Sequence, residues 1–300
     1  MQFPPEIKAI LGGDPISITP LEKGATGDVW QICTQNQCFA FKHLTKRAPT
    51  AQLALDVHVR KLLITQGGAV SRPVSHGETW VLDEFVQGVH PERGSVPKAA
   101  CIRLGETLKL LHKQPVQGFG QPKLSSSGQI VGQHTDPLTG ISTRLSNPVP
   151  SADQLNQNPA CRADTRFSTA LPPYLAKLQA KLAENRASLC HSDLHERQFI
   201  IKNGALAALI DFGEATIADP RWDFGSLLYF HGPEVLAHTL LGYGASISVE
   251  DAYLFSLGIA LHHANRSILG GKSHRLKVAS VHLQKALLYL GKINGENYVT

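Results

Sequence analysis

The feature that most constrains this chain is a pair of short segments, LCHSDLHERQFII at 189–201 and LAALIDFGE at 206–214. Apolar residues flank the charged part of the first segment on both sides, which indicates a polar loop held between strands. The second segment is typical of an apolar strand that delivers Asp211 to its end. Asp211 follows Asp193 by 18 positions, with a Lys-Asn-Gly turn at 202–204 between them. We therefore predict a hairpin that brings the two carboxylates to one side.

Two carboxylates and an amide at this spacing suit the chemistry of a metal–phosphate site. A carboxylate at Asp193 can accept the proton of a substrate hydroxyl and orient its oxygen for attack. Asp211, at the end of a strand, can bind a Mg²⁺ ion that bridges the β- and γ-phosphates of a nucleotide. Gln198 offers an amide oxygen to the same metal. The alternative interpretation of the first segment is an ordinary loop with solvated charges.

Two features nearer the N-terminus favour a phosphate-binding role. Gly24 and Gly27 precede a strand, and glycines there let backbone N–H groups approach phosphate oxygens. Lys42 ends an apolar β run and can reach the α- and β-phosphates. We assign Asp56 as its partner, because it is the only acidic residue on the helix that follows. Taken alone, the glycines are more typical of a hairpin turn, and the lysine fits a strand edge equally well.

The first part of the chain has the patterns of a small β-rich lobe. Residues 16–42 contain alternating runs typical of strands, and 78–86 predict another strand. Apolar residues at near-helical spacing predict a helix over 50–65. A glycine after the last strand suggests a hinge at about 84–88. We expect residues 1–88 to form an N-terminal nucleotide-binding lobe.

The remainder, 89–300, is expected to form a larger, mainly helical lobe for catalysis and substrate binding. Apolar residues three and four apart predict helices near 101–111 and 171–182, and 233–290 is mostly helical in pattern. Between the first two helices, 115–168 is a long polar stretch rich in Ser, Gly, Pro, Gln and Asn. Three interpretations stay open for this insertion: a substrate lid, a set of short irregular elements, or a partly mobile segment.

Composition argues against several classes of protein. The net charge is +5 with no basic block, whereas nucleic-acid binders concentrate their charge on one stripe, so we expect no nucleic-acid partner. No run of about 18 apolar residues occurs, so we expect no membrane span. The five cysteines are scattered and form no CxxC pair, which favours reduced thiols in a cytoplasmic protein. The oligomeric state is not indicated. Those cysteines are Cys33, Cys38, Cys101, Cys161 and Cys190.

The joint order of these pieces resembles one family. HSDLHERQ and LIDFGEATIADPRWDFGSLL are similar to the catalytic-loop and metal-loop patterns, HxDLHxx(N) and IDFGxAxxxDPxxDxG, of the aminoglycoside phosphotransferase and choline kinase superfamily. The glycine loop, the lysine strand and the hinge also fall where that family places them. The resemblance covers about 16 to at least 230.

The resemblance implies an α+β, protein-kinase-like bilobal fold with ATP between a β-rich N-lobe and a mainly helical C-lobe. It implies that Lys42 pairs with the phosphates, Asp193 is the catalytic base and Asp211 binds Mg²⁺. It implies transfer of the γ-phosphate of ATP to a hydroxyl of a small molecule, with a preference for ATP over GTP left open. The backbone of the hinge is implied to bind adenine, through Glu84, Phe85 and Val86.

The sequence departs from the family pattern at several positions. Gln198 replaces the catalytic-loop asparagine with a side chain one methylene longer, which puts the coordination geometry of the metal in doubt. Asp56 replaces the usual glutamate as the partner of the lysine, and Glu22 stands where a protein kinase has its first glycine. Asp219 and Asp223 match the acids that brace the two loops in the family.

The acceptor is constrained mainly by charge. Residues 229–300 carry four acids against six Lys or Arg and six His. A polycationic aminoglycoside needs several carboxylates, so this balance disfavours it, and a neutral or anionic hydroxylated metabolite fits at least as well. Aromatic residues for a choline-type substrate are present but equally suit a core.

Two alternative functions stay open beside a small-molecule kinase. A protein kinase is disfavoured because no APE motif or activation segment of the usual length follows Gly213. A catalytically impaired homologue that acts by binding nucleotide is favoured only by Gln198.

Overall fold

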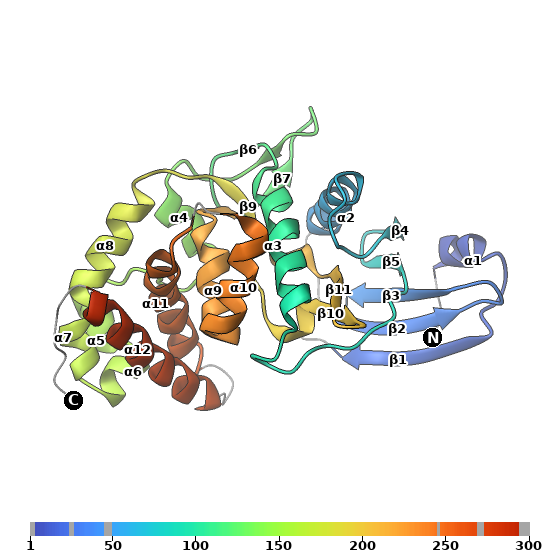
Figure 1. Cartoon of the computed structure of the whole chain (residues 1–300). Helices are drawn as coiled ribbons and strands as arrows, with labels where there is room; N and C mark the ends of the chain where they lie inside the picture. The colour runs from blue at the N-terminus through green and yellow to red at the C-terminus, as the bar shows by residue number, and fades with distance from the viewer. Residues whose placement is uncertain (1–3, 24–26, 45–49, 245–246, 269–272, 294–300) are drawn as a thin grey trace.

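The computed structural model describes residues 4–23, 27–44, 50–244, 247–268 and 273–293, in an α+β arrangement. A β-sheet built from the first part of the chain lies at one end of the molecule, and a group of helices from the second part lies at the other (Figure 1). The predicted fold class is therefore confirmed.

The N-terminal sheet has five antiparallel strands in the order β1-β2-β3-β5-β4. Its side chains alternate between a small apolar core and solvent, and that core includes Ile32, Phe41 and Leu82. Gly27 needs to be glycine, because a Cβ there would lie 2.4 Å from the backbone oxygen of His43 on β3. The elements are α1 (Pro5–Leu11), β1 (Ser17–Lys23), β2 (Gly27–Cys33), β3 (Cys38–Leu44), α2 (Thr50–Thr65), β4 (Pro73–His76) and β5 (Trp80–Glu84).

The prediction that all five cysteines are reduced is wrong for two of them. Cys33 and Cys38 face each other across the β2–β3 hairpin and form a disulfide, with their Cα atoms 4.0 Å apart. The hairpin turn places the pair in register, which the spacing of five residues did not reveal. Cys101, Cys161 and Cys190 are free and buried.

The connection after β5 is fixed against the second part of the chain. Val89 and Ile201 exchange two backbone hydrogen bonds, with N···O distances of 2.9 and 2.8 Å. Gly88 permits this approach, because a Cβ there would lie 2.6 Å from the carbonyl oxygen of Ile201. The predicted hinge region therefore contacts strand β10 (Phe199–Lys202) directly.

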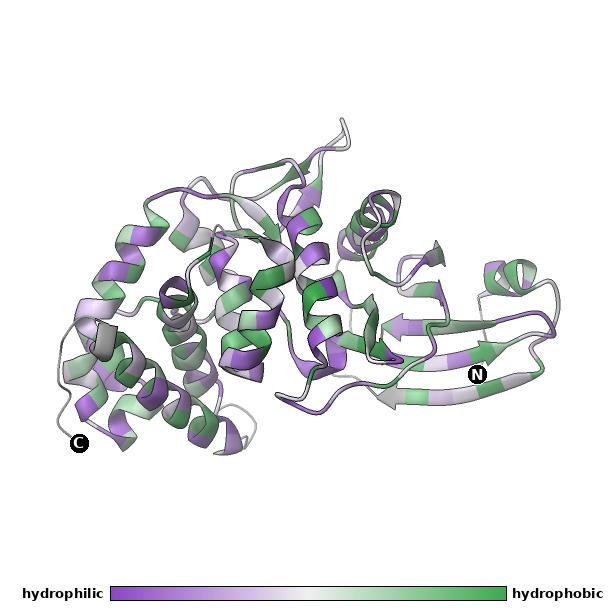
Figure 2. Ribbon diagram, viewed as in Figure 1, coloured by the Kyte–Doolittle hydropathy of each residue, from purple (hydrophilic) through white to green (hydrophobic). Residues whose placement is uncertain are grey.

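Helices surround the main hydrophobic core. Helix α3 packs against α10, and α11 packs against α9 and α12. Hydrophobic residues run through α9, α10 and α11 in Figure 2, which fits helices that are covered on several sides. Their bounds are α3 (Lys98–His112), α8 (Pro172–Leu182), α9 (Arg221–His231), α10 (Pro233–Tyr243), α11 (Val249–Asn265) and α12 (Ser273–Ile293).

The polar stretch 115–168 forms a series of short elements. Three two-residue strands pair in the order β6-β8-β7, and four short helices follow. Asp136 caps the first of these helices by accepting a hydrogen bond from the Thr139 N–H, at 2.7 Å. The elements are β6 (Val116–Gln117), β7 (Lys123–Leu124), β8 (Ile130–Val131), α4 (Pro137–Ser142), α5 (Ala152–Gln157), α6 (Pro159–Ala163) and α7 (Arg166–Ala170).

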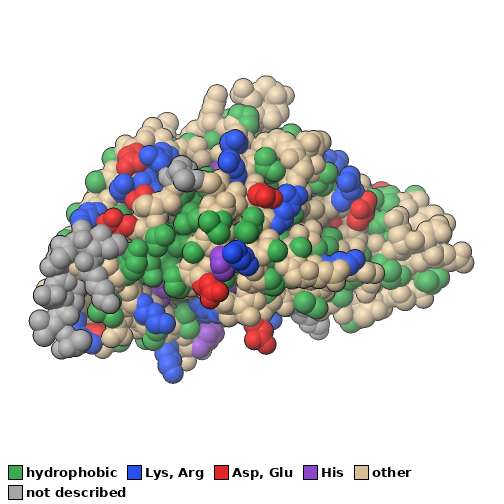
Figure 3. Space-filling model, in the orientation of Figure 1, with side chains coloured by type: hydrophobic (Ala, Val, Ile, Leu, Met, Phe, Trp, Pro, Cys, Tyr) green, Lys and Arg blue, Asp and Glu red, His purple; other side chains and the backbone are tan. Residues whose placement is uncertain are grey.

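Two expectations from the sequence concern the outside of the molecule: that it has no membrane span and no stripe of basic residues. Among the described helices, none combines the length and the hydrophobicity needed to cross a membrane. On the face shown in Figure 3, Lys and Arg side chains are scattered among acidic ones and do not gather in one stripe.

Candidate active site

The hairpin predicted between the two key aspartates is present. Strand β10 pairs with β11 (Ala205–Leu209) in antiparallel register, and the turn has left-handed backbone at Asn203 and Gly204. Gln198 precedes the hairpin and its carbonyl accepts the Ile210 N–H at 3.0 Å. The two ends of the hairpin are therefore held beside each other, with Asp211 next in the chain.

Asp193 lies on the loop after β9 (Ser188–Cys190), with both carboxylate oxygens near a basic side chain. Arg144 lies 3.3 Å from Oδ1, and His195 Nε2 lies 3.5 Å from Oδ2. Burial would raise the pKa of Asp193, but His195 and Arg144 outweigh it and lower the pKa to about 2. The residue before it, Ser192, has a positive φ of 66°, a conformation that costs energy and is concentrated at functional sites.

Asp211 also has left-handed backbone, with φ of 62°, and pairs with Lys42. The ammonium of Lys42 lies 2.9 Å from Oδ1. Burial opposes ionisation of Asp211, but the charge and hydrogen bond of Lys42 lower its pKa, while the charge of Asp193 acts in the opposite direction. The two carboxylates are therefore close enough to influence each other, and both are ionised at neutral pH.

The assignment of Asp56 as the partner of Lys42 is corrected by this geometry. Asp56 is paired instead with Arg60, one helical turn later, whose Nε donates to it at 3.1 Å. Arg60 is 2% exposed and also donates to Asp83 at 2.6 Å. A buried guanidinium with two carboxylates forms a stronger fork than a lysine could. Asp56 still reaches the metal loop, because its Oδ1 accepts the backbone N–H of Phe212 at 3.2 Å.

The loop that carries Asp193 is held by Asp223. The carboxylate of Asp223 is fully buried and accepts the N–H groups of His191 and Ser192, each at 2.8 Å. His112 Nε2 lies 3.0 Å from the same carboxylate. The predicted bracing role therefore fits this residue.

Asp219 has a different partner. Its carboxylate binds Arg221, which donates from Nε at 2.9 Å and from Nη2 at 2.6 Å. It therefore braces the start of α9 and not the two loops.

Gln198 and His195 form a small polar group beside Asp193. His195 Nδ1 accepts the N–H of Arg197 at 3.2 Å, so the neutral ring carries its proton on Nε2, toward Asp193. The Gln198 amide lies 3.2 Å from that Nε2 and 3.5 Å from the Asp193 carboxylate. Gln198 is therefore placed between the base and the start of the hairpin.

Four other predicted nucleotide-binding positions lie at the N-terminal sheet or outside the described residues. Gly24 lies outside the described residues, and Gly27 lies within β2, paired with β3. Glu84 ends β5, and its side chain lies 3.6 Å from that of Arg72. Phe85 donates its backbone N–H to Cys38 at 3.0 Å.

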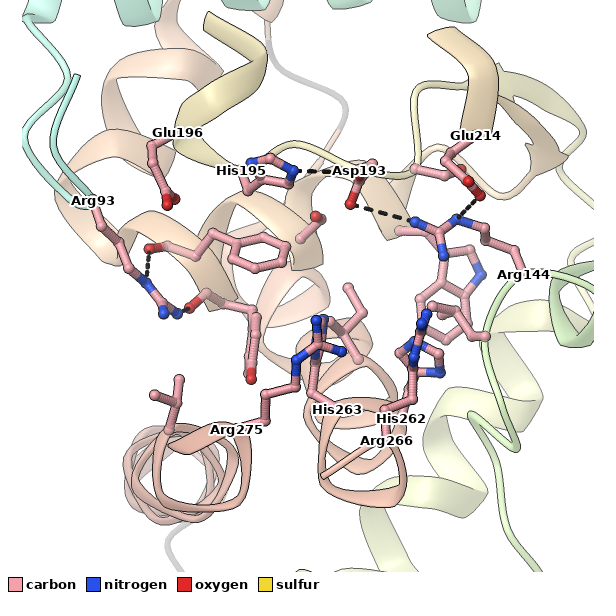
Figure 4. Close-up of a pocket in the computed structure, with 18 of the residues that line it drawn as sticks. Arg93, Arg144, Asp193, His195, Glu196, Glu214, His262, His263, Arg266 and Arg275 are labelled. Atoms are coloured by element: carbon pink, nitrogen blue, oxygen red, sulfur yellow. Dashed lines mark hydrogen bonds and ion pairs between the residues drawn. The ribbon is translucent and has the colours of Figure 1, made fainter. Parts of the chain in front are cut away.

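A pocket of about 470 Å³ opens beside Asp193. Asp193, His195 and Arg144 lie along one side of it, and residues of α11 and the start of α12 form the opposite side (Figure 4). Arg144 was missed by sequence reasoning. It follows α4 in the polar stretch 115–168, where no motif marked any residue.

The comparisons with known proteins come from sequence and from fold. The sequence model of the phosphotransferase enzyme family matches residues 17–254. No curated protein matches the chain.

Several solved structures have a similar fold. One is a thermostable mutant of aminoglycoside phosphotransferase APH(4)-Ia in its apo form, with a TM-score of 0.67 and 16% identity over 94% of this chain and 97% of that one. A variant of that mutant, in a ternary complex with ADP and hygromycin B, has a TM-score of 0.66 and 15% identity, over the same shares of the two chains. The GDP and kanamycin complex of APH(2")-IIia gives 0.62 and 16%, over 92% and 94%. At these identities the similarity establishes a common fold.

Proposed function

The chain belongs to the phosphotransferase enzyme family, and on that premise we propose that it transfers the γ-phosphate of ATP to a hydroxyl group of a small molecule. The observation that carries the proposal is the pair of ionised carboxylates, Asp193 and Asp211, at the two ends of one hairpin motif. One faces the pocket of about 470 Å³ and the other is paired with Lys42. Two such carboxylates beside a lysine suit phosphoryl transfer.

Asp193 is proposed to act on the acceptor. It lines the pocket with an ionised carboxylate, so it can accept a hydrogen bond from a hydroxyl and take its proton. His195 and Arg144 contact its two oxygens and fix the orientation of the carboxylate. The hydroxyl oxygen is thereby oriented for attack on a phosphate.

Asp211 and Gln198 are the proposed Mg²⁺ ligands. The fit rests on the donor set: an ionised carboxylate and an amide oxygen are the hard oxygen ligands that Mg²⁺ prefers. Lys42, whose ammonium is held by Asp211, is available to the phosphates. A bound Mg²⁺ would neutralise charge on the phosphates. In this structure the Gln198 amide nitrogen lies near Asp193 and His195, which leaves the amide oxygen as the atom that would bind the metal.

The nucleotide is proposed to bind between an N-terminal lobe of residues 1–88 and a C-terminal lobe of 89–300. The N–H groups of Glu84 and Phe85 are donated to Arg72 and Cys38, so we assign adenine recognition to the backbone carbonyls of 84–86 and to the Val86 N–H. Gly24 and Gly27 are proposed to flank the phosphate loop. Structures of similar fold contain ADP in one case and GDP in another, so both nucleotides belong in the test.

The test uses purified protein with Mg²⁺ and either ATP or GTP. Calorimetry measures nucleotide binding, and a coupled assay measures ADP or GDP formation across a panel of hydroxylated metabolites and aminoglycosides. Asp193→Asn is expected to lower turnover about a hundredfold or more while leaving nucleotide binding nearly intact. Asp211→Ala is expected to weaken binding of Mg·ATP. Asp164→Asn, which changes a half-buried carboxylate paired with Arg166 and outside the pocket, is the control and should change neither quantity.

Three results would count against the proposal. Nucleotide binding with no turnover on any acceptor would favour a homologue that acts by binding. Phosphorylation of proteins but of no metabolite would favour a protein kinase. Full turnover in Asp193→Asn would remove the assigned base.

A further inference from the structure

The pocket beside Asp193 is lined on its far side by basic residues. Arg266 follows α11, and Arg275 lies in the first turn of α12. In Figure 4 these two side chains, together with His262 and His263, stand across the pocket from Asp193. The two helices therefore place two guanidinium groups where an acceptor would lie.

These arginines have no acidic partner within the described residues. No carboxylate there lies within 4.0 Å of either guanidinium. Three acids line the pocket: Asp193 is the proposed base, Glu214 lies 3.3 Å from Arg144, and Glu196 stands on the His195 side, across from the two arginines (Figure 4). The first turn of α12 contains no acidic residue, although acids are the residues that a helix N-terminus favours. Among the described residues, no carboxylate therefore pairs with the two charges on this side of the pocket.

Positive charges nearby contribute to the low pKa values of His262 and His263, which lie on the same side of the pocket. Burial, together with the charges of Arg275 and Arg144, lowers the pKa of His263 to about 3. His262, also at about 3, accepts the Ser146 N–H on Nδ1 at 2.7 Å, so its neutral ring carries a proton on Nε2. At neutral pH this ring adds a hydrogen-bond donor to the site.

Buried polar groups in the pocket also lack partners. Trp222 lines the pocket and is 2% exposed, yet its indole N–H has no hydrogen-bond acceptor among the described residues. The buried hydroxyl of Ser192, which also lines the pocket, has no partner in the same part of the chain. An indole N–H can only donate, and a buried donor without an acceptor is costly. Both atoms are buried within the pocket wall, so they do not contact a ligand in this conformation of the pocket.

We propose that the phosphate acceptor is a small hydroxylated molecule that carries a carboxylate or phosphate group, bound through Arg266 and Arg275, with its hydroxyl at Asp193. This inference rests on the phosphotransferase function proposed above. Carboxylate and phosphate oxygens match the fork geometry of arginine. A polycationic aminoglycoside would place positive charge against both arginines, which disfavours it. A volume of about 470 Å³ suits a small metabolite.

The first experiment compares acceptors that differ only in charge. A three-carbon series contains glycerol, glycerate, glycerol phosphate and serinol, and a six-carbon series contains glucose, glucuronate, glucose phosphate and glucosamine. ADP formation from Mg·ATP is measured for each, with kanamycin as the polycation. The anionic members are expected to give a kcat/KM at least about tenfold above the neutral and cationic members of their series. Comparison of the carboxylate with the phosphate members distinguishes the two anions.

The second experiment measures binding with the nucleotide site filled by AMP-PNP. Glycerol phosphate and glucuronate are titrated into the wild type and into an Arg266→Gln/Arg275→Gln variant. The variant is expected to bind both anions about tenfold or more weakly, because it loses two charge-assisted contacts. A Lys277→Gln/Lys285→Gln variant is the matched control, since it removes two exposed charges from α12 that do not line the pocket. The control should bind like the wild type.

The two proposals fail in different ways. Normal AMP-PNP binding with preferred phosphorylation of glucosamine, serinol or kanamycin would overturn the anionic acceptor alone. Equal binding of both anions to the wild type and the arginine variant, or no binding of either to the wild type, would also overturn it. Failure of AMP-PNP binding itself would instead count against the phosphotransferase function.

Discussion

Replacing Asp223 by asparagine should separate positioning of the catalytic loop from general stability. The carboxylate accepts two backbone N–H groups, from His191 and Ser192, through different oxygens. An asparagine of the same size has one acceptor oxygen, and its amide nitrogen can only donate. Whichever way the amide is turned, one of the two backbone N–H groups loses its acceptor and meets another donor.

The size of the effect follows from that single lost bond. A hydrogen bond to a charged group contributes about 1.5–3 kcal/mol, so Asp223→Asn should lower the free energy of unfolding by roughly 2 kcal/mol. The affected loop includes Ser192, whose φ of 66° is unfavourable without support. If the active loop conformation is disfavoured by the same amount, turnover falls about 30-fold. The KM for ATP should change little, because Asp223 forms no hydrogen bond or ion pair with Lys42 or Asp211.

Urea unfolding and the rate of ADP formation measure the two effects separately. Asp219→Asn is the control, since Asp219 is equally buried but binds Arg221 in place of the loop. It should lower stability without the 30-fold loss of turnover expected above. Equal losses of turnover in the two variants, or an unchanged unfolding free energy in Asp223→Asn, would refute the reasoning.

The difference in unfolding free energy between the wild type and Asp223→Asn should change with pH in one direction. Burial would raise the pKa of Asp223, but the hydrogen bond and charge of His112 and the other donors lower it. A folded-state pKa below the unfolded value of about 3.9 stabilises the protein above that pH, and the contribution is lost as pH falls through the folded-state pKa. The stability gap between wild type and Asp223→Asn should therefore be constant near neutral pH and narrow below about pH 4.

Three further predictions concern the site and its support. His195→Ala should raise the pKa of Asp193 from about 2, because the variant lacks the hydrogen bond that lowers this pKa. The acid limb of a kcat/KM–pH profile should therefore move to higher pH, and an unmoved limb would contradict this. Gln198→Asn should leave turnover equal or higher in the coupled assay, and complete loss of activity would show that the longer amide is required. Arg60→Met should lower the free energy of unfolding by about 3–5 kcal/mol in urea titrations, because the buried Asp56 and the half-buried Asp83 lose their guanidinium. A change below about 1 kcal/mol would mean that the carboxylates become solvated or protonated at little cost.

The parts of the site that could be predicted are those whose geometry is local in sequence. The hairpin between Asp193 and Asp211 is encoded by apolar runs on either side of one turn, so its spacing alone indicates that the carboxylates converge. The helix over 50–65 and the strand within 78–86 follow from periodicity in the same way. The family resemblance, confirmed by the match over residues 17–254, rests on those same local motifs.

The parts that could not be predicted depend on contacts between distant segments. Asp56 was assigned to Lys42 by elimination among acids, but Arg60 lies one turn away on the same helix and offers two donors to its carboxylate. Lys42 then pairs with Asp211, which is 169 positions away. Arg144 reaches Asp193 from a stretch with no periodicity, so only the folded chain reveals the contact. In each case local patterns identify the ionic groups but do not determine which of them pair.

The low pKa of Asp193 bears on how this residue would act. A carboxylate with a pKa of about 2 is a weak base, and a base of that strength would contribute little to a reaction that needs early proton removal. In the loose transition state of phosphoryl transfer the hydroxyl makes little bond to phosphorus, so its proton can leave late and base strength matters less than position. Arg144 and His195, which weaken the base, also hold its two oxygens in place. Their presence beside Asp193 is therefore compatible with catalysis only if that residue acts mainly by orienting the hydroxyl.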